Sequence, residues 1–123
     1  MAQLFRAGLI LLLVTLCPPL AQAAPSARDG RDLPATTLAE LPAEARATLR
    51  AIKQGGPFAY DRDGVVFGNY ERILPEHSRG YYHEYTVKTP GVSNRGVRRI
   101  VCGPPVECYY TADHYQTFKR IRE

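Results

Sequence analysis

The chain has no tryptophan, only three cysteines and three histidines, and no second long hydrophobic run after the one at its start. Without another apolar run of roughly 20 residues, a membrane-spanning helix is excluded from the rest of the chain. The absence of internal repeats and low-complexity tracts there excludes a repeat protein. Hydrophobic residues make up 45% and charged residues 23% of the 123 residues, which is typical of one globular domain and excludes wholesale disorder or a collagen-like fibre.

The first 23 residues have the pattern of a secretory signal peptide. Arg6 supplies a positive charge near the start, an apolar run follows over 9–16, and small residues precede a cleavage site after Ala23. That apolar run is too short to span a bilayer. The alternative is a lipoprotein anchored through Cys17, but the residues before this cysteine lack the small side chain expected there. We therefore expect a secreted protein that keeps no membrane contact once the signal peptide is removed.

Removal of the signal peptide would leave Cys102 and Cys108 as a pair, and 15 Lys and Arg against 12 Asp and Glu, or a net charge of +3. A cysteine pair in an exported chain favours a disulfide, and two free thiols are the alternative. The disulfide would close a loop of about 7 residues and stabilise the fold by roughly 2.4 kcal/mol. The cysteines have no His or acid partners at ligand spacing and do not predict a zinc site. The small positive charge favours a polyanionic partner without identifying one.

The chain after the signal peptide divides into two parts. Residues 24–38 have no apolar period and predict a flexible linker or a pro-segment, and the folded domain is predicted over 39–123 as a monomer with one modest core. At its start, Pro42 suits a first helical turn, and apolar residues then recur at spacings of three and four. Gly55 ends this pattern, so the sequence predicts a helix over 42–54.

After the helix the pattern changes to that of β-strands, with stretches rich in Val, Thr and Tyr between Gly, Pro and Asn turns. The predicted strands cover 65–67, 81–87, 97–102, 107–111 and 117–121. Short strands joined by such turns predict an antiparallel meander. One N-terminal helix packed on a twisted antiparallel β-sheet gives an α+β fold.

Among the few residues suited to acid–base chemistry, Glu84 is unusual because it lies in the middle of a predicted strand. Strand alternation places Glu84 on one face with Tyr82 and Thr86. This face could be a solvated surface, on which Glu84 forms ordinary ion pairs with arginines of the next strand. Arg98 and Arg99 point to opposite faces of that strand and cannot share a role.

The three histidines could in principle hold a metal ion in a hydrolase. The spacing of His77, His83 and His114 matches no ligand motif, however. His114 follows Asp113 in a tyrosine-rich segment and, taken alone, is typical of an exposed loop. The sequence therefore predicts no metal site and no cofactor.

Four separated runs resemble the small secreted bacterial ribonucleases related to barnase, and most of all the guanyl-specific streptomycete type. Three of these runs are YYHEYTV over 81–87, RRI over 98–100 and YYTADHY over 109–115. The fourth, DGVVFGNYE over 63–71, resembles the guanine-recognition loop of that family and is followed by the expected Leu-Pro pair. The runs occur in the family's order, and the resemblance covers about Leu41 to Ile121. It implies the microbial ribonuclease fold, in agreement with the predicted helix and sheet.

The resemblance also implies a catalytic set. Glu84 matches the general base and His114 the general acid. Arg95 and Arg99 match the arginines that hold the scissile phosphate, and Tyr115 matches a tyrosine that contacts it. Carboxylate, imidazole and guanidinium suit RNA cleavage without a metal because a base, an acid and a cation that binds the phosphate are what the reaction needs.

The same resemblance implies a guanine site, with Asn69 and Glu71 as the guanine-binding pair and Phe67 and Tyr70 beside the base. Glu71 can accept the N1–H and N2 amino hydrogens of guanine, whereas adenine presents an acceptor at N1. The chain departs from its bacterial relatives at Gly68, where they often have Gln or Ser, and at Tyr70, where they often have Arg. Fungal guanyl-specific relatives do use a tyrosine there, as a lid over the base.

A further departure concerns the cysteines. The streptomycete-type enzyme joins its two termini through a disulfide, whereas Cys102 and Cys108 lie close together in one predicted hairpin. The chain is therefore expected to have a disulfide within this hairpin in place of one between the termini.

The expected activity is cleavage of single-stranded RNA on the 3′ side of guanosine through a 2′,3′-cyclic phosphate, followed by hydrolysis to the 3′-phosphate. Because the reaction requires the 2′-hydroxyl, DNA is expected to bind without being cut. A small acidic barstar-like inhibitor is a plausible partner by analogy. The rival classes are a nucleic-acid-binding module without catalysis and a structural or inhibitor-type domain. A complete acid–base set argues against both.

Overall fold

The computed structural model describes residues 14–17 and 32–123. Residues 14–17 are exposed and have no regular structure, and the rest of the predicted signal peptide lies outside the described residues. None of the helices in these two ranges is long and apolar enough to cross a membrane. Within residues 32–123 the chain forms β1 (Ala35–Thr37), α1 (Ala43–Gln54), β2 (Val65–Phe67), β3 (Tyr82–Thr86), β4 (Arg99–Gly103), β5 (Glu107–Thr111) and β6 (Lys119–Arg122).

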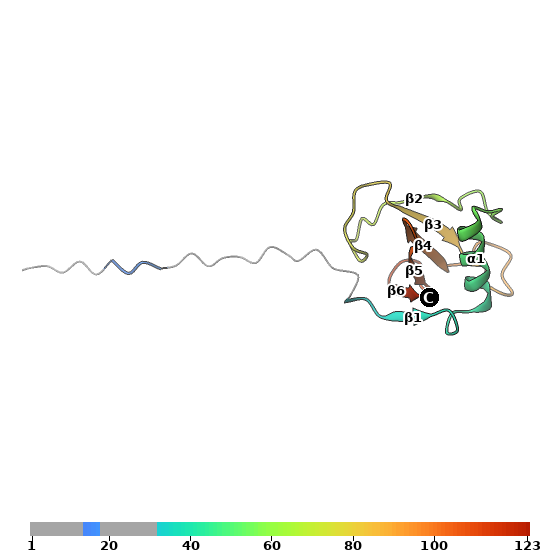
Figure 1. Ribbon diagram of the computed structural model, residues 1–123, viewed down its shortest axis with the longest axis horizontal. Coiled ribbons are helices and arrows are strands. Elements are labelled where there is room, and N and C mark those ends of the chain that lie inside the picture. The colour runs from blue at the N-terminus through green and yellow to red at the C-terminus, as the bar shows by residue number, and fades with distance from the viewer. Residues whose placement is uncertain (1–13, 18–31) are drawn as a thin grey trace, which may run out of the picture.

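The strands form one sheet in the order β1-β6-β5-β4-β3-β2. Strands β2 to β6 pair antiparallel with their sequence neighbours, which confirms the predicted meander. The helix α1 covers one face of this sheet, and the segment between β2 and β3 extends on the other side (Figure 1). The predicted α+β architecture is therefore confirmed.

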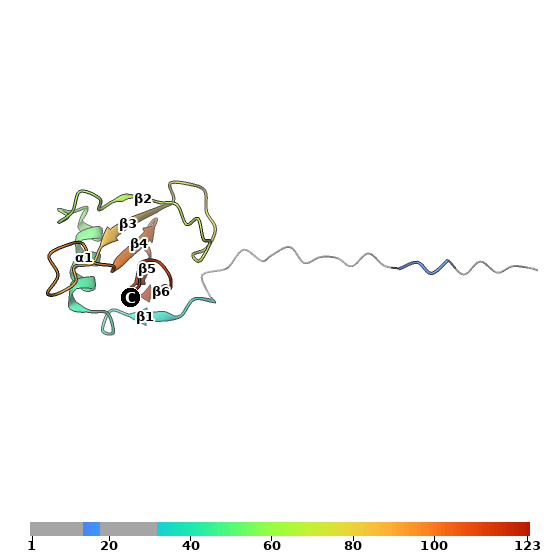
Figure 2. The ribbon, with the colours of Figure 1, turned by 180° about the vertical axis from the view of Figure 1, so that it is seen from behind.

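The sheet has one strand that the sequence pattern did not indicate. β1 lies within 24–38, which was predicted to be a linker, and pairs parallel with β6 at the edge of the sheet. Figure 2 shows the two strands side by side near the C-terminus. The backbone N–H of Arg120 donates to the carbonyl of Pro34 at 2.8 Å, and Thr36 is only 5% exposed. Ordered structure thus begins before residue 39, and the sheet is mostly rather than wholly antiparallel.

The boundaries of α1 follow from its end residues. Pro42 is the N-cap, and Gly55 ends the helix in the left-handed conformation with φ of 77°. The N–H groups of Gly55 and Gly56 donate to the carbonyls of Ile52 and Ala51, so the last turn is closed by its own backbone. The apolar stripe buries Ala45 and Leu49 against the sheet, in accord with the predicted helix.

Both faces of the sheet are buried, and side-chain alternation divides the core in two. On the face toward α1, the buried cluster consists of Leu41, Ala45, Leu49, Val87, Ile100, Cys102, Cys108, Tyr110 and Ile121. On the opposite face it consists of Leu74, Tyr82, Val101, Tyr109 and Phe118. The second cluster lies beneath the segment between β2 and β3, because Leu74 belongs to that segment and the Tyr82 hydroxyl donates to its Pro75 carbonyl at 2.6 Å.

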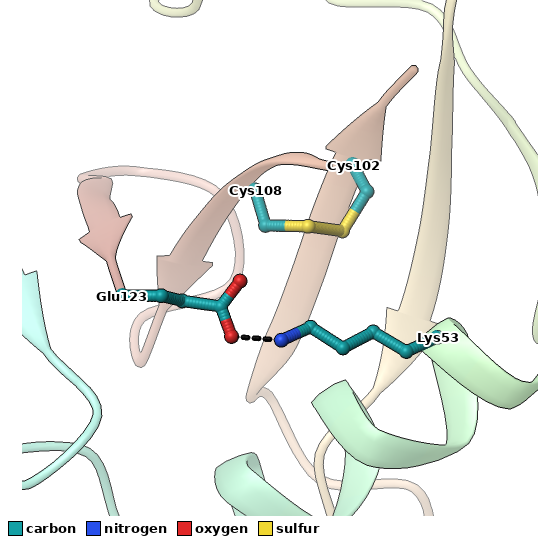
Figure 3. Close-up of a disulfide and its surroundings, with 4 residues drawn as sticks. All are labelled: Lys53, Cys102, Cys108 and Glu123. Atoms are coloured by element: carbon teal, nitrogen blue, oxygen red, sulfur yellow. Dashed lines mark hydrogen bonds and ion pairs between the residues drawn. A yellow bond between two sulfur atoms is a disulfide. The ribbon is translucent and has the colours of Figure 1, made fainter. Parts of the chain in front are cut away.

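The predicted disulfide between Cys102 and Cys108 is present. It joins two residues that face each other across β4 and β5, and both cysteines are buried on the α1 side. Figure 3 shows the disulfide together with the ion pair between Lys53 of α1 and Glu123 near the end of the chain. The β4–β5 hairpin and the C-terminal segment are thus both fastened on this face.

Candidate active site

A cavity of about 290 Å³ lies on the face of the sheet opposite α1. Its walls come from β2 and the following loop, from the middle of β3, and from the segment between β5 and β6. The lining residues are Val66, Phe67, Gly68, Asn69, Tyr70, Glu71, Ile73, Glu84, Tyr115 and Phe118. The cavity therefore gathers all four predicted guanine-site residues with two of the predicted catalytic set.

Glu84 projects from β3 into this cavity and is only 8% exposed. Tyr82 and Thr86 are buried on the same strand, as the alternation predicted, and the alternative of a solvated face is wrong. Burying a carboxylate is costly unless a cation or hydrogen bonds compensate. Here Arg95 Nη2 lies 3.8 Å from Glu84 Oε1.

Arg95 is held beside Glu84 by Thr86. Its Nε and Nη2 groups both donate to Thr86 Oγ1, at 3.0 and 2.9 Å. The backbone N–H of Thr86 in turn donates to the Asp63 carboxylate at 2.7 Å. The sequence placed Thr86 on the face of Glu84 but gave it no role, and the role becomes visible only from its contact with Arg95.

Arg99 is 3% exposed and lies on β4, directly across from β3. Its Nη1 donates to the carbonyls of Gly96 and Arg98, and its Nε donates to the Tyr115 hydroxyl at 3.1 Å. The charge of Arg98 partly offsets the rise that burial causes in the pKa of Tyr110, a residue of the α1-side core, which places the Arg98 guanidinium toward that face. The two arginines therefore point to opposite faces, as the alternation predicted.

Tyr115 connects Arg99 to the cavity. Burial, and then the nearby Glu84 carboxylate, raise the pKa of Tyr115, while Arg99 opposes this shift. The hydroxyl therefore keeps its proton at neutral pH and can act as a donor. The ring stacks on Phe67 with centroids 5.2 Å apart, and Phe67 contacts Phe118 edge-on at 6.0 Å. These three rings form the apolar wall of the cavity.

His114 stands next to Tyr115, with ring centroids 4.8 Å apart, and its side chain is exposed. His114 and Tyr115 both have a left-handed backbone, with φ of 55° and 70°. The backbone N–H of His114 donates to the carbonyl of Val97, which fastens this loop to the segment carrying Arg95. His114 is thus exposed on the solvent side of Tyr115, in the exposed loop that the sequence indicated, and it is not among the residues that line the cavity.

The predicted recognition loop is closed by Asn69. Its Oδ1 accepts the Leu74 backbone N–H at 3.2 Å, and its Nδ2 donates to the carbonyls of Leu74 and Pro75. Asn69 itself has a φ of 51°, a conformation that asparagine tolerates better than most residues. The Asn69 side chain is therefore engaged within the loop, while Glu71 is exposed and free to face a ligand in the cavity.

The three histidines lie in separate surroundings. His77 stacks on Tyr81 with centroids 3.7 Å apart, His83 Nδ1 pairs with the Gly64 carbonyl at 2.8 Å, and His114 lies in the loop before β6. Across residues 14–17 and 32–123, no three His, Cys, Asp or Glu side chains come together in a group that could hold a metal ion.

Comparison with known proteins finds ribonucleases that are similar in sequence and in fold. A family model described as ribonuclease matches residues 23–122. Guanyl-specific ribonuclease Sa3 of Kitasatospora aureofaciens is 60% identical over 82 residues, which are 66% of this chain and 58% of that protein, so the chain spans less than two thirds of this relative. Guanyl-specific ribonuclease Sa of the same organism is 58% identical over 85 residues, covering 68% of this chain and 88% of the relative.

A solved structure is also similar. The crystal structure of ribonuclease Sa2 with guanosine-2′-cyclophosphate has a TM-score of 0.70 and 49% sequence identity, and the match covers 73% of this chain and 96% of that one.

Proposed function

Because the chain belongs to the ribonuclease family, we propose that it is a guanyl-specific endoribonuclease that cleaves single-stranded RNA on the 3′ side of guanosine. The observation that carries the proposal is the buried Glu84 carboxylate, which shares one cavity with Glu71 of the recognition loop and lies 3.8 Å from Arg95. Relatives named as guanyl-specific ribonucleases support the same activity.

In the first step, Glu84 acts as the general base. Its carboxylate takes the proton of the ribose 2′-hydroxyl while the 2′-oxygen bonds to phosphorus, and the bond from phosphorus to the 5′-oxygen breaks. A carboxylate is a weak base for an alcohol, so proton transfer and attack on phosphorus must be concerted. The position of Glu84 inside the cavity suits this role, because water is largely displaced and Arg95 offsets the buried charge.

His114 acts as the general acid in this step. Its imidazolium gives a proton to the departing 5′-oxygen, and its exposed place at the solvent side leaves room for the leaving strand. In the second step His114 takes a proton from water as the water oxygen bonds to phosphorus. Protonated Glu84 then returns its proton to the 2′-oxygen, and the 2′,3′-cyclic phosphate opens to the 3′-phosphate.

The phosphate is held by Arg95, which lies beside Glu84, and by Arg99, which Tyr115 connects to the cavity. Negative charge grows on the non-bridging oxygens as phosphorus becomes five-coordinate, and fixed guanidinium groups stabilise this charge. The hydrogen bonds to Thr86 and Tyr115 orient the two arginines before substrate binds. The protonated Tyr115 hydroxyl is a further donor to the same oxygens.

Guanine is recognised by the loop after β2. Glu71 accepts the N1–H and the N2 amino hydrogens of guanine, and Phe67 and Tyr70 provide aromatic surface for the base. Asn69 contributes by holding the loop closed, since its side-chain groups are already paired with the backbone at Leu74 and Pro75. Its contacts with the base are therefore made through the backbone.

The test is cleavage of a defined single-stranded RNA in the presence of excess chelator. We expect cuts after guanosine, products ending first in a cyclic phosphate, and a rate reduced by at least about 10² in Glu84→Gln. Glu44→Gln is the matched control, because this glutamate lies in the first turn of α1 on the other face of the sheet. Dependence on a metal, or a Glu84→Gln rate near that of wild type, would contradict the mechanism.

The same assay tests the guanine site. Glu71→Gln should reduce the preference for guanosine over adenosine, because a glutamine amide has only one acceptor oxygen and cannot accept both the N1–H and an N2 amino hydrogen of guanine. An unchanged preference would move recognition away from Glu71.

Secretion is a separate part of the proposal. The signal peptide predicts an extracellular enzyme whose mature chain begins after Ala23, and N-terminal sequencing of protein from the culture medium tests this. The acidic inhibitor stays a prediction by analogy.

A further inference from the structure

Tyr70 is the most exposed large hydrophobic side chain of the cavity, at 81%, yet two neighbours fix it in place. An aromatic ring with so much solvent contact would ordinarily sample several rotamers. The two neighbours are Gly68 and Arg79, which lie before and after Tyr70 in the segment between β2 and β3.

Gly68 provides the space against which the ring lies. A Cβ atom at Gly68 would stand 2.5 Å from Cε2 and Cζ of the Tyr70 ring, which is closer than real Cβ contacts. The φ of Gly68 is outside the left-handed region, so the backbone itself does not require glycine. The missing side chain at 68 is therefore used for the close approach of the Tyr70 ring.

Arg79 holds the other end of the ring. Its Nη1 donates to the Tyr70 hydroxyl at 2.5 Å, and its Cζ lies 5.8 Å from the ring centroid. The planar guanidinium can combine the hydrogen bond with attraction to the ring face. Arg72 is an exposed arginine of the same segment and, within residues 32–123, forms no hydrogen bond or cation–π contact with Tyr70.

Tyr70 lines two hollows. One is the recognition cavity, and the other, of about 220 Å³, is also lined by Glu76 and His77. Without Arg79, the ring would have room to turn away from the recognition cavity into the second hollow. The contacts with Gly68 and Arg79 oppose that motion.

We propose that Gly68, Tyr70 and Arg79 form a preset wall of the guanine pocket, in which Gly68 and Arg79 are positioning residues for the Tyr70 ring. The inference rests on the proposed function. A side chain already ordered before binding loses less conformational entropy when the nucleotide arrives, so the wall increases affinity for the base. It acts on binding and leaves the chemical step unchanged.

Arg79→Met tests the contact between Arg79 and the Tyr70 ring. Arg72→Met is the control for the loss of one positive charge in the same segment. We expect Arg79→Met to raise the Kd for guanosine 3′-monophosphate and the KM for a guanosine-containing dinucleotide three- to tenfold, with kcat unchanged. Arg72→Met should change both constants less than twofold. In a Tyr70→Ala background, Arg79→Met should have no further effect. Equal effects of the two arginine variants, or an Arg79 effect that persists without Tyr70, would overturn the proposal.

Gly68→Ala tests the other contact. The added methyl group displaces the ring, so affinity for guanosine 3′-monophosphate should fall in the presence of Tyr70 and change little in the Tyr70→Ala background. Additive losses in this cycle would overturn the coupling.

A ligand-free measurement separates this inference from the proposed function. The aromatic ring should shift the Gly68 Hα resonances upfield, and Tyr70→Ala should remove that shift, whether or not the protein cleaves RNA. Gly68 resonances that do not respond to Tyr70→Ala would overturn the proposed wall. A wild-type protein that shows the shift but binds no guanosine nucleotide would overturn the proposed function instead.

Discussion

At the scale of single residues, the backbone of His114 shows how much of the site depends on local conformation. His114 and Tyr115 are consecutive residues with left-handed φ, a conformation that costs most side chains energy. The cost is offset nearby, because Thr111 Oγ1 accepts the Tyr115 backbone N–H at 3.1 Å and the Val97 carbonyl accepts that of His114. The result is an imidazole exposed to solvent beside the half-buried phenol of Tyr115.

This conformation decides how the proposed role of His114 as general acid should be tested. His114→Ala is expected to slow cleavage of a guanosine-containing dinucleotide by at least about 10² while leaving nucleotide binding largely intact. Alanine is poorly suited to a φ of 55°, so His114→Asn is the matched variant, because asparagine tolerates the left-handed region. Both variants should be equally slow in single-turnover assays. An Asn variant within a few-fold of wild type would remove the imidazole from the mechanism and assign the Ala effect to the backbone.

At the scale of elements, the strands were easier to predict than the loops that contain Asn69 and His114. The alternation in β3 places Tyr82, Glu84 and Thr86 on one face, and local periodicity is sufficient to find it. No such periodicity reveals that the Asn69 side chain is hydrogen-bonded within its own loop. Its partners are backbone groups five and six residues later, and their residue types do not show the contact. The left-handed backbone of His114 and Tyr115 could not be predicted from the sequence either, since neither residue is a glycine.

The loop between β5 and β6 is held by Asp113, which gives a prediction at this scale. Its carboxylate accepts from the Thr117 hydroxyl and backbone N–H at 2.6 and 2.9 Å, and from the Thr111 hydroxyl at 2.9 Å. The hydrogen bonds from Thr117, and to a lesser extent that from Thr111, lower the pKa of Asp113. A carboxylate with a depressed pKa stabilises the folded state above its unfolded-state pKa, and this contribution is lost as the pH falls through the folded-state value.

Asp113→Asn should therefore lower the free energy of unfolding by about 1 kcal/mol at neutral pH. The difference from wild type should shrink as the pH falls below about 4, because the wild-type carboxyl then also becomes protonated. Urea unfolding at neutral pH and at about pH 3 measures both values. Asp61→Asn, at an exposed aspartate in another turn, is the control. A gap between Asp113→Asn and wild type that is equal at both pH values would show that the charge of Asp113 does not stabilise the loop.

At the scale of the whole molecule, the two ends of the folded region are joined at one edge of the sheet. β1 pairs with β6, and Lys53 of α1 pairs with Glu123 (Figure 3). Local patterns could not reveal β1, because Ala35–Thr37 is three residues long and has no apolar alternation. Its partner lies more than 80 positions away, with Thr36 opposite Ile121. The strand exists because of a tertiary contact, which outweighs the propensity of its own residues.

The contribution of this edge can be measured by truncation. A chain that begins at residue 32 keeps β1, whereas one that begins at residue 39 loses it and leaves β6 as an unpaired edge. We expect the shorter chain to be less stable by about 2 kcal/mol or more, since it loses several backbone hydrogen bonds worth about 1 kcal/mol each. The buried Thr36 is lost with them. Cleavage by the shorter chain should persist below its melting temperature, because Glu84, Arg99 and His114 lie outside β1. Equal unfolding midpoints in urea for the two chains would mean that β1 adds nothing to the fold, and that the domain begins at residue 39 as its sequence pattern indicated.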